Sequence, residues 1–267
     1  MRSLEDMMSL TGKCAVVTGA AGGIGIKIAE TIAELGGRLI LVDVQSTDWT
    51  PVVSHLTSHW PTVDIQCINC DLEQEKERDK LIAQVLGDND RVHLFVHSAA
   101  FVGSQSLVGW VTEFEHQSLE TWRRAFEVNL TAAFHLTQGL TQSLKLSGGS
   151  VILISSIYGE LGPDYSLYDD TAMGNPAAYA ASKGGIIQLT RWLSTTLAPD
   201  IRVNCLSPGG VERGQNSVFI KRYERRTPLA RMANEEDFKG VIALLGTQAG
   251  SYITGQNIMV DGGWSVW

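Results

Sequence analysis

Short apolar runs recur along the chain, bounded by turn-forming residues and separated by stretches with helical spacing. Unbroken Val, Ile and Leu, rather than alternating apolar and polar positions, indicate strands covered on both faces, as crossover helices cover a parallel sheet. The runs are Cys14–Thr18, Arg38–Asp43, Val63–Ile68, Val92–Val96, Ser150–Ile154, Ile201–Cys205 and Asn257–Val260. They predict an α/β fold: a doubly wound Rossmann-type parallel sheet of about seven strands with helices on both faces.

The length of the chain and the lack of a linker bear on domain number. The 267 residues, 44% of them hydrophobic, fit one large α/β domain or two small ones. No internal repeat, low-complexity tract or linker rich in Pro, Gly and Ser divides the sequence. We therefore expect one Rossmann-type domain over residues 1–267.

Charge and composition narrow the class of partner. A formal net charge of −8 disfavours nucleic acid, which calls for clustered Lys and Arg, so we expect a small-molecule partner. Residues 1–10 mix charged with apolar side chains, and no later run is apolar enough to span a membrane, so we expect a cytoplasmic protein without a membrane partner. One Cys-x-x-Cys, at Cys67 and Cys70, favours ordinary thiols over a metal site.

The first predicted strand runs directly into a glycine-rich turn that precedes a helical stretch. Glycines at Gly19, Gly23 and Gly25 allow a tight turn and close approach of the backbone to a pyrophosphate at the N-terminus of that helix. Asp43 ends the second predicted strand, where a carboxylate accepts hydrogen bonds from the adenosine ribose and repels a 2′-phosphate. No Lys or Arg follows in Val44 and Gln45. The pattern favours NAD over NADP; the alternative for Asp43 is a solvated acid at a strand end.

The glycine spacing Thr-Gly-x-x-x-Gly-x-Gly, followed far downstream by Tyr179-Ala-Ala-Ser-Lys183, resembles the short-chain dehydrogenase/reductase family. The resemblance extends from about Leu10 to the Val-Asp-Gly-Gly ending at Gly263 and includes Val-Asn-Leu, Ile-Ser-Ser and Ser-Pro-Gly motifs in the family's order. It implies a catalytic tetrad of Asn129, Ser156, Tyr179 and Lys183. It also implies cofactor contacts from Gly19, Gly23, Ile24, Gly25, Asp43, Asp71, Leu72, Ser98, Ala99, Tyr179, Lys183, Pro208, Gly209 and Val211.

Tyr179 and Lys183 lie four residues apart, so on a helix their side chains share one face. A tyrosine normally has a pKa of about 10, and base catalysis near neutral pH needs the ammonium to lower it to roughly 7. Tyr179 would then exchange a proton with the substrate oxygen, and Lys183 would also hold the nicotinamide ribose. Ser156 would stabilise charge on that oxygen, and Asn129 would position a water that feeds protons toward Lys183. Taken singly, each residue has an ordinary structural explanation; their combination favours catalysis.

The sequence departs from the family's usual pattern in three places. After the fourth strand the chain has His97-Ser98 where the family commonly has two asparagines, and we expect His97 to be a hydrogen-bonded histidine at a strand end rather than an acid/base. Arg213 stands where the family often has a Thr that binds the carboxamide. The gap between Ser156 and Tyr179 is longer than usual, which indicates an insertion beside the chemistry.

Two segments bear on the substrate. The insertion, around residues 160–176, carries tyrosines and aspartates that suit a hydroxylated, sugar-like compound, although it also fits a polar surface loop. A second segment, around 210–231, corresponds to the family's substrate lid and is rich in basic residues, which suggests an anionic group or else a solvated helix face or subunit contact. Its basic residues are Arg213, Lys221, Arg222, Arg225, Arg226 and Arg231.

The resulting expectation is an NAD-dependent oxidoreductase that interconverts a secondary alcohol and a carbonyl. Its substrate would be a sugar derivative or another polar, anionic hydroxy compound. The alternatives are a 3-oxoacyl thioester reductase and a non-catalytic NAD-binding sensor or scaffold of the same fold. The family's helical dimer faces and the aromatic surface of residues 262–267 lead us to expect a homotetramer, with a dimer second.

Overall fold

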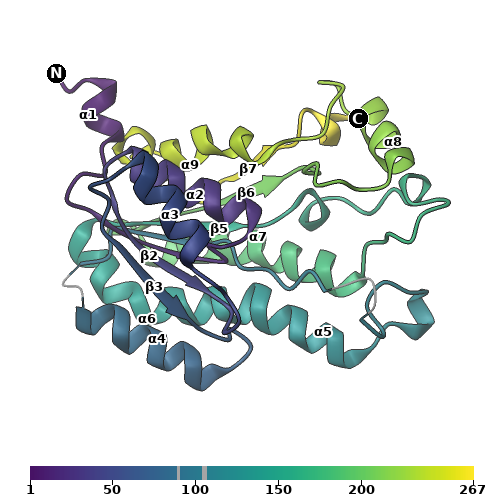
Figure 1. Cartoon of the computed structure of the whole chain (residues 1–267), viewed down its shortest axis with the longest axis horizontal. Coiled ribbons are helices and arrows are strands. Elements are labelled where there is room, and N and C mark those ends of the chain that lie inside the picture. The colour runs from purple at the N-terminus through teal and green to yellow at the C-terminus, as the bar shows by residue number, and fades with distance from the viewer. Residues whose placement is uncertain (89–90, 104–106) are drawn as a thin grey trace.

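A parallel sheet in the strand order β3-β2-β1-β4-β5-β6-β7 forms the centre of the molecule (Figure 1). The structure is a computed structural model and describes residues 1–88, 91–103 and 107–267. The strands are β1 (Cys14–Thr18), β2 (Arg38–Asp43), β3 (Ile65–Asn69), β4 (Leu94–His97), β5 (Ser150–Ile154), β6 (Arg202–Pro208) and β7 (Asn257–Val260). This is the Rossmann-type α/β fold that the apolar runs predict.

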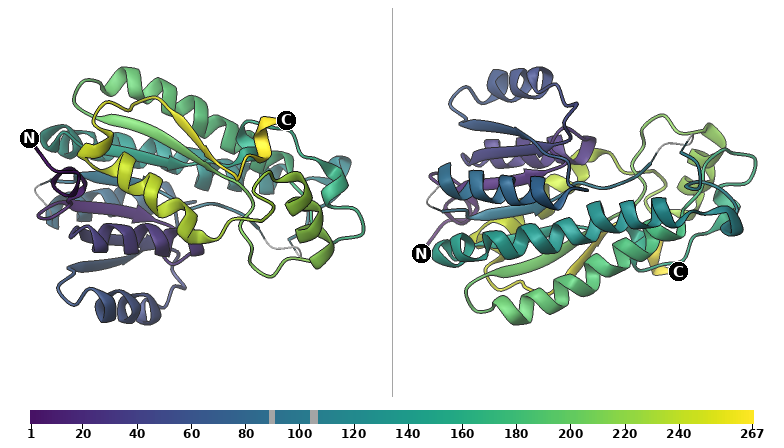
Figure 2. Two further views of the ribbon diagram at one scale, coloured as in Figure 1. Left: turned by 90° about the horizontal axis from the view of Figure 1, so that it is seen from above. Right: turned by 90° about the horizontal axis from the view of Figure 1, so that it is seen from below.

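Helices cover both faces of the sheet (Figure 2). The α-helices of the described residues are α1 (Leu4–Met8), α2 (Gly23–Glu34), α3 (Thr50–His59), α4 (Glu75–Asp88), α5 (Leu119–Phe126), α6 (Ala132–Ser147), α7 (Ala177–Leu197), α8 (Ser217–Arg226) and α9 (Lys239–Gly246). One core cluster joins the sheet to α2, α3 and α9, and the other joins it to α4, α6 and α7. Alternate residues of the central strands enter opposite clusters, so Val16 faces one and Val17 the other, which explains the unbroken apolar runs.

The strand borders differ from the predicted ones by a few residues. Val63 donates its backbone N–H to Trp60 in a turn, so β3 begins only at Ile65. β6 continues to Pro208, beyond the predicted end at Cys205, because its last residues pair with β7. In the described part of the chain, no helix is long and apolar enough to cross a membrane.

The strand order reverses at β1, which has β2 on one side and β4 on the other. In an open parallel sheet, the crevice at the carboxyl ends of such strands is the usual place for a ligand. The segment before α7 and the helix α8 lie beyond this end of the sheet, away from the N-terminus (Figures 1 and 2).

Candidate active site

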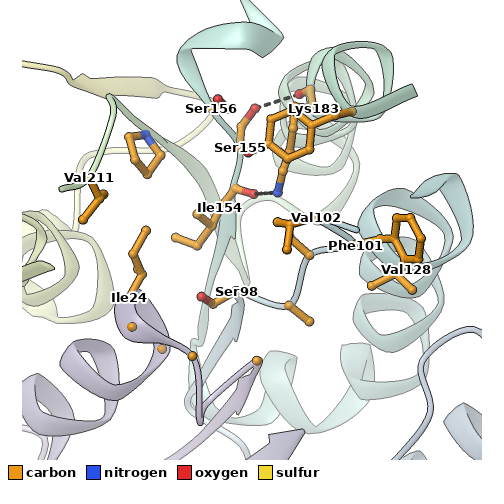
Figure 3. A pocket seen from close by; sticks show the side chains of 18 of the residues that line it. Ile24, Ser98, Phe101, Val102, Val128, Ile154, Ser155, Ser156, Lys183 and Val211 are labelled. Atoms are coloured by element: carbon orange, nitrogen blue, oxygen red, sulfur yellow. Dashed lines mark hydrogen bonds between the residues drawn. The ribbon is translucent and has the colours of Figure 1, made fainter. Parts of the chain in front are cut away.

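A cavity of about 850 Å³ lies at the carboxyl ends of the central strands. It runs from Asp43 and Asp71 past the glycine turn to Tyr179 and Lys183. Figure 3 shows Ile24 and Val211 on one side of it, with Lys183 on the other. Of the expected catalytic tetrad and cofactor-binding residues, all but Asn129 line this cavity.

The glycine turn depends on the absence of side chains. Gly19 has a φ of +65°, and a Cβ there would lie 2.6 Å from the backbone nitrogen of Ala99. A Cβ on Gly25 would lie 1.9 Å from the carbonyl oxygen of Gly19. Gly22 is the N-cap of α2 and offers no side-chain cap, so the first amides of this helix remain available to an anion.

Asp43 is fixed at the end of β2 by two backbone donors. Its Oδ2 accepts the N–H of Ala21 at 2.8 Å, and its Oδ1 accepts that of Val44 at 2.8 Å. Each carboxylate oxygen keeps lone pairs that can accept ribose hydroxyls. Among the described residues that line the cavity, the cationic ones are Arg124, Lys183 and Arg213, and none of them is hydrogen-bonded or ion-paired to Asp43.

The loop after β3 forms the same end of the cavity. Asp71 caps its own turn by accepting the N–H of Glu73, whose carboxylate holds Arg124 through both oxygens. The carbonyl of Leu72 accepts a hydrogen bond from the buried Arg78 at 2.5 Å. Arg78 therefore fixes the backbone at Leu72, which with Asp71 is one of the cofactor contacts implied by the family resemblance.

Tyr179 faces the cavity from the first turn of α7. Burial raises its pKa, while a hydrogen bond with Ser156 and the charge of Arg213 lower it by smaller amounts. This differs from the expectation that Lys183 depresses the phenol pKa, because the loss of hydration outweighs the nearby positive charges. The ammonium of Lys183 lies 5.8 Å from the centre of the Tyr179 ring.

Lys183 is anchored to the end of β5. Its Nζ donates to the carbonyl of Ile154 at 2.8 Å, and its own carbonyl accepts the hydroxyl of Ser155 at 2.7 Å (Figure 3). Burial lowers the pKa of Lys183 to about 8. Because this pKa lies above 7, the charged ammonium form of Lys183 predominates at neutral pH in the free protein.

Asn129 lies in a π-helical turn, Glu127–Thr131, between α5 and α6. Its Oδ1 accepts the N–H of Phe101 at 2.6 Å, and its Nδ2 donates to Ser182 at 2.9 Å. Ser182 in turn donates to the carbonyl of Tyr179. The amide thus braces the tyrosine turn of α7 through Ser182, a contact that sequence reasoning missed. The water relay expected at Asn129 stays a prediction.

His97 is fully buried at the end of β4 and has a partner on each ring nitrogen. Since the carbonyl of Val128 can only accept, Nε2 carries the proton and donates to it at 3.1 Å. Nδ1 then accepts the hydroxyl of Thr18 at 3.0 Å. Burial, with a smaller effect from Lys183, lowers the pKa of His97 to about 3. It is the neutral, hydrogen-bonded histidine that the sequence favours over an acid/base.

The basic lid and the acidic insertion bind each other. Arg226 pairs with Asp164 at 3.2 Å, and Arg222 pairs with Asp170 at 3.6 Å. These aspartates do not line the cavity, and of the six basic lid residues only Arg213 does. Five of the six basic lid residues therefore lie outside the cavity, which favours the alternative of a solvated helix face over an anionic substrate group for them. Charges from segments far apart in the sequence neutralise each other at the surface instead.

Aromatic side chains line the cavity beyond Tyr179. The hydroxyls of Tyr158 and Tyr168 hydrogen-bond at 2.5 Å, and the Tyr168 ring packs against Phe219 of α8 with centroids 5.5 Å apart. Burial raises the pKa of both phenols, that of Tyr168 to about 12, so both stay protonated. The aromatic residues of the insertion were noted in the sequence, but the pairing of Tyr168 with Tyr158 was not.

The C-terminal aromatic residues divide between core and surface. Trp264 is buried against Tyr223, with Arg226 over its ring at 4.4 Å, whereas Trp267 is exposed. Only part of the aromatic surface expected from residues 262–267 is therefore available to a partner subunit.

The cysteine pair gives no sign of a metal site. Burial raises the pKa of Cys67 and Cys70, that of Cys70 to about 12, which keeps both as thiols. In residues 1–88, 91–103 and 107–267, no group of three or more His, Cys, Asp or Glu side chains could hold a metal ion.

The cavity suits a dinucleotide. Its glycine turn exposes backbone amides, a carboxylate stands at one end, and a tyrosine and a lysine lie at the other. Gly19, Ile24, Gly25, Pro208, Gly209 and Val211 would hold the cofactor between the turn and the strand ends, with Asp43, Asp71, Leu72, Ser98 and Ala99 toward the adenosine and Lys183 toward the nicotinamide ribose.

Comparison with known proteins adds a family to this geometry. A family model described as Enoyl-(Acyl carrier protein) reductase matches residues 19–265. A tropinone reductase homolog from Arabidopsis thaliana is 31% identical over 273 residues, covering 98% of this chain and 94% of its own.

Two solved structures illustrate the likeness in three dimensions. A short-chain dehydrogenase from Leptospira borgpetersenii, with bound NAD+, is 30% identical and has a TM-score of 0.82, with 99% of this chain and 96% of that chain covered. A putative NAD(P)-dependent gluconate 5-dehydrogenase from Beutenbergia cavernae, with bound NADP, is 29% identical and has a TM-score of 0.84, with 97% and 99% covered.

Proposed function

The chain belongs to the short-chain dehydrogenase/reductase family of oxidoreductases, and we propose that it interconverts a secondary alcohol and a carbonyl with NAD as its cofactor. One observation carries the proposal: a single cavity joins the glycine turn and Asp43 to Ser156, Tyr179 and Lys183. A bound nicotinamide supplies the hydride acceptor or donor.

The side chains supply the proton and the charge stabilisation. Tyr179 transfers a proton to or from the substrate oxygen, and the hydroxyl of Ser156 stabilises charge that develops on that oxygen. Lys183 provides a positive charge beside the phenol, and Asn129 keeps the Tyr179 turn in place through Ser182.

The raised pKa of Tyr179 bears on direction. A protonated phenol can donate to a carbonyl oxygen at neutral pH without prior ionisation, whereas alcohol oxidation needs the phenolate. We therefore expect reduction to be favoured near pH 7 and oxidation to accelerate as the pH rises.

The preference for NAD rests on Asp43. Its carboxylate is held by two backbone amides, so it cannot readily turn away from an incoming 2′-phosphate. Both NAD and NADP occur among the related structures, so the local charge at Asp43 is what supports NAD here.

The substrate end of the cavity favours an uncharged compound with a ring. Aromatic faces from Tyr158, Tyr168 and Phe219 can pack on C–H groups, and the phenol pair can hydrogen-bond a hydroxyl or a carbonyl. A neutral sugar-like or alicyclic compound fits this surface better than a phosphorylated one, because Arg222 and Arg226 of the lid are already paired with aspartates of the insertion. We propose that residues 160–176 and 210–231 together form the cap over the substrate.

Two alternatives remain distinguishable by experiment. A 3-oxoacyl thioester reductase would act on acyl thioesters, and a sensor or scaffold would bind the dinucleotide without turnover. For assembly we propose a homotetramer, since Trp122 on α5, Phe134 on α6 and Trp192 on α7 leave apolar surface exposed.

The deciding experiment follows NADH or NADPH oxidation with a panel of cyclic ketones, keto sugars and 3-oxoacyl thioesters. We expect NADH-dependent reduction of a neutral cyclic ketone or keto sugar, with turnover reduced at least a hundredfold in Tyr179→Phe and NADH affinity retained. The exposed Tyr252→Phe serves as a matched control and should be unchanged. Full activity in Tyr179→Phe would refute the assigned role, and NADH binding with no turnover of any compound would favour the sensor.

A further inference from the structure

Arg213 lies on the glycine turn rather than over the substrate. A Cβ on Gly23, the first residue of α2, would lie 2.7 Å from a terminal nitrogen of the Arg213 guanidinium. The backbone of Arg213 is held in a closed turn, because Gln215 accepts its N–H at 2.7 Å and donates to Val211. The guanidinium is therefore directed to the place where the amides of α2 are open to an anion.

Glu235 stands at the same place. Its Oε1 accepts a hydrogen bond from Nε of Arg213 at 2.7 Å and would also lie 2.7 Å from a Cβ on Gly23. Asn234 caps this turn reciprocally with Asp237, which in turn binds Arg231, so Glu235 is presented from a rigid segment. Burial acts to raise the pKa of Glu235, but the hydrogen bond and the charge of Arg213 act to lower it, and the net effect is a lowered pKa. The carboxylate therefore stays ionised at neutral pH.

The hydrogen bond to Glu235 uses only Nε of the guanidinium. Within the described part of the chain the two terminal nitrogens donate no hydrogen bond, and the edge that they form reaches the glycine turn. This edge suits bidentate binding of a phosphate group. The other cations of the cavity are committed: Arg124 to Glu73, and Lys183 to the carbonyl of Ile154.

α2 has no acidic residue in its first turn, so Glu235 brings a negative charge from a distant segment to the N-terminus of this helix. A diphosphate bound at the turn would lie beside both the Arg213 cation and the Glu235 anion. Attraction to one and repulsion from the other would act on the same ligand group.

We propose that Arg213 binds the diphosphate of the dinucleotide and that Glu235, besides orienting Arg213, opposes that diphosphate and so limits cofactor affinity. The inference rests on the proposed dinucleotide function and assigns to this chain a diphosphate contact at a position where the family often has a threonine. A limited affinity for the dinucleotide lets the cofactor dissociate after hydride transfer.

The test uses ADP-ribose, which contains the diphosphate, and adenosine, which lacks it. Affinity for ADP-ribose is measured by isothermal titration calorimetry and affinity for adenosine by ligand-observed NMR, so neither readout depends on turnover. We expect Arg213→Gln to weaken ADP-ribose about tenfold and Arg213→Lys to have an intermediate effect, because lysine keeps the charge and loses the fork. Glu235→Gln keeps an acceptor for Nε and removes the charge, so it should tighten ADP-ribose about threefold.

The controls separate this effect from general damage. Adenosine should bind all variants equally, and Arg225→Gln, which removes one positive charge of α8 outside the cavity, should leave ADP-ribose affinity unchanged. Equal binding of ADP-ribose by wild type and Arg213→Gln would overturn the inference and leave the proposed function intact. Parallel weakening of adenosine, or weaker ADP-ribose binding in Glu235→Gln, would also overturn it. If the wild type binds neither ADP-ribose nor NADH, both proposals fail.

Discussion

Replacing Arg78 by methionine should destabilise the protein by breaking one buried junction. The Arg78 side chain is 2% exposed and joins three segments: Nη1 donates to the carbonyl of Leu72, Nη2 to Glu127 at 2.8 Å and Nε to His135 at 3.1 Å. Methionine fills much of the same space and removes all three hydrogen bonds.

The size of the stability loss follows from the two groups that lose their hydrogen-bond donor, the carboxylate of Glu127 and the carbonyl of Leu72. Removing one partner of a buried ion pair costs about 3–5 kcal/mol, mainly because the other partner loses its compensation. The side chain of Glu127 is 36% exposed, so water can solvate it, and the cost falls at the lower end. The carbonyl of Leu72 loses a donor at a buried site. We expect a loss of about 3 kcal/mol, which for 267 residues corresponds to a decrease in Tm of about 5 °C.

The measurement is urea denaturation of wild type and Arg78→Met at one protein concentration, followed by circular dichroism, with a thermal melt alongside. Arg123→Met on α5 is the matched control, since Arg123 is exposed, and it should change the unfolding free energy by less than about 0.5 kcal/mol. A loss of less than about 1 kcal/mol of unfolding free energy in Arg78→Met would show that the buried contacts of Arg78 contribute little to stability, and it would refute this reasoning.

Two further predictions concern His97 and the glycine turn. His97 stays neutral in the folded protein, where its pKa is about 3, but in the unfolded chain it binds a proton below about pH 6.5, so the folded state loses stability as the pH falls. Relative to His97→Asn, the unfolding free energy of the wild type, measured by urea titration, should decrease by about 2 kcal/mol between pH 7.5 and 5.0. Parallel pH profiles of the two proteins would contradict this. Gly25→Ala places a methyl group against the Gly19 carbonyl and should abolish NADH binding measured by fluorescence. The control is Gly240→Ala, in open space on α9, which should keep NADH binding and stabilise the folded protein by up to about 1 kcal/mol. Intact NADH affinity in Gly25→Ala would argue against the steric account of the turn.

Local patterns determined the sheet and the placement of the glycine turn. The apolar runs of β1, β2 and β5 have the same borders in the sequence and in the structure, because each is buried on both faces and bounded by turn residues. The π-helical turn at Glu127–Thr131 gave no signal, since it departs from an α-helix by only one residue per turn. Helical spacing also put Tyr179 and Lys183 on one face of α7, although their catalytic roles stay predictions.

Tertiary contacts decided the electrostatics of the site. The sequence shows basic residues in the lid and acidic ones in the insertion, but only folding brings Arg226 to Asp164 and Arg222 to Asp170 and so removes these charges from the substrate cavity. Burial, which no local pattern measures, raises the pKa of Tyr179 despite its neighbouring lysine. A sequence therefore specifies which chemical groups are present and, through periodicity, which face they occupy. Their pairing and hydration depend on segments distant in the chain, and these set the charge that a substrate meets.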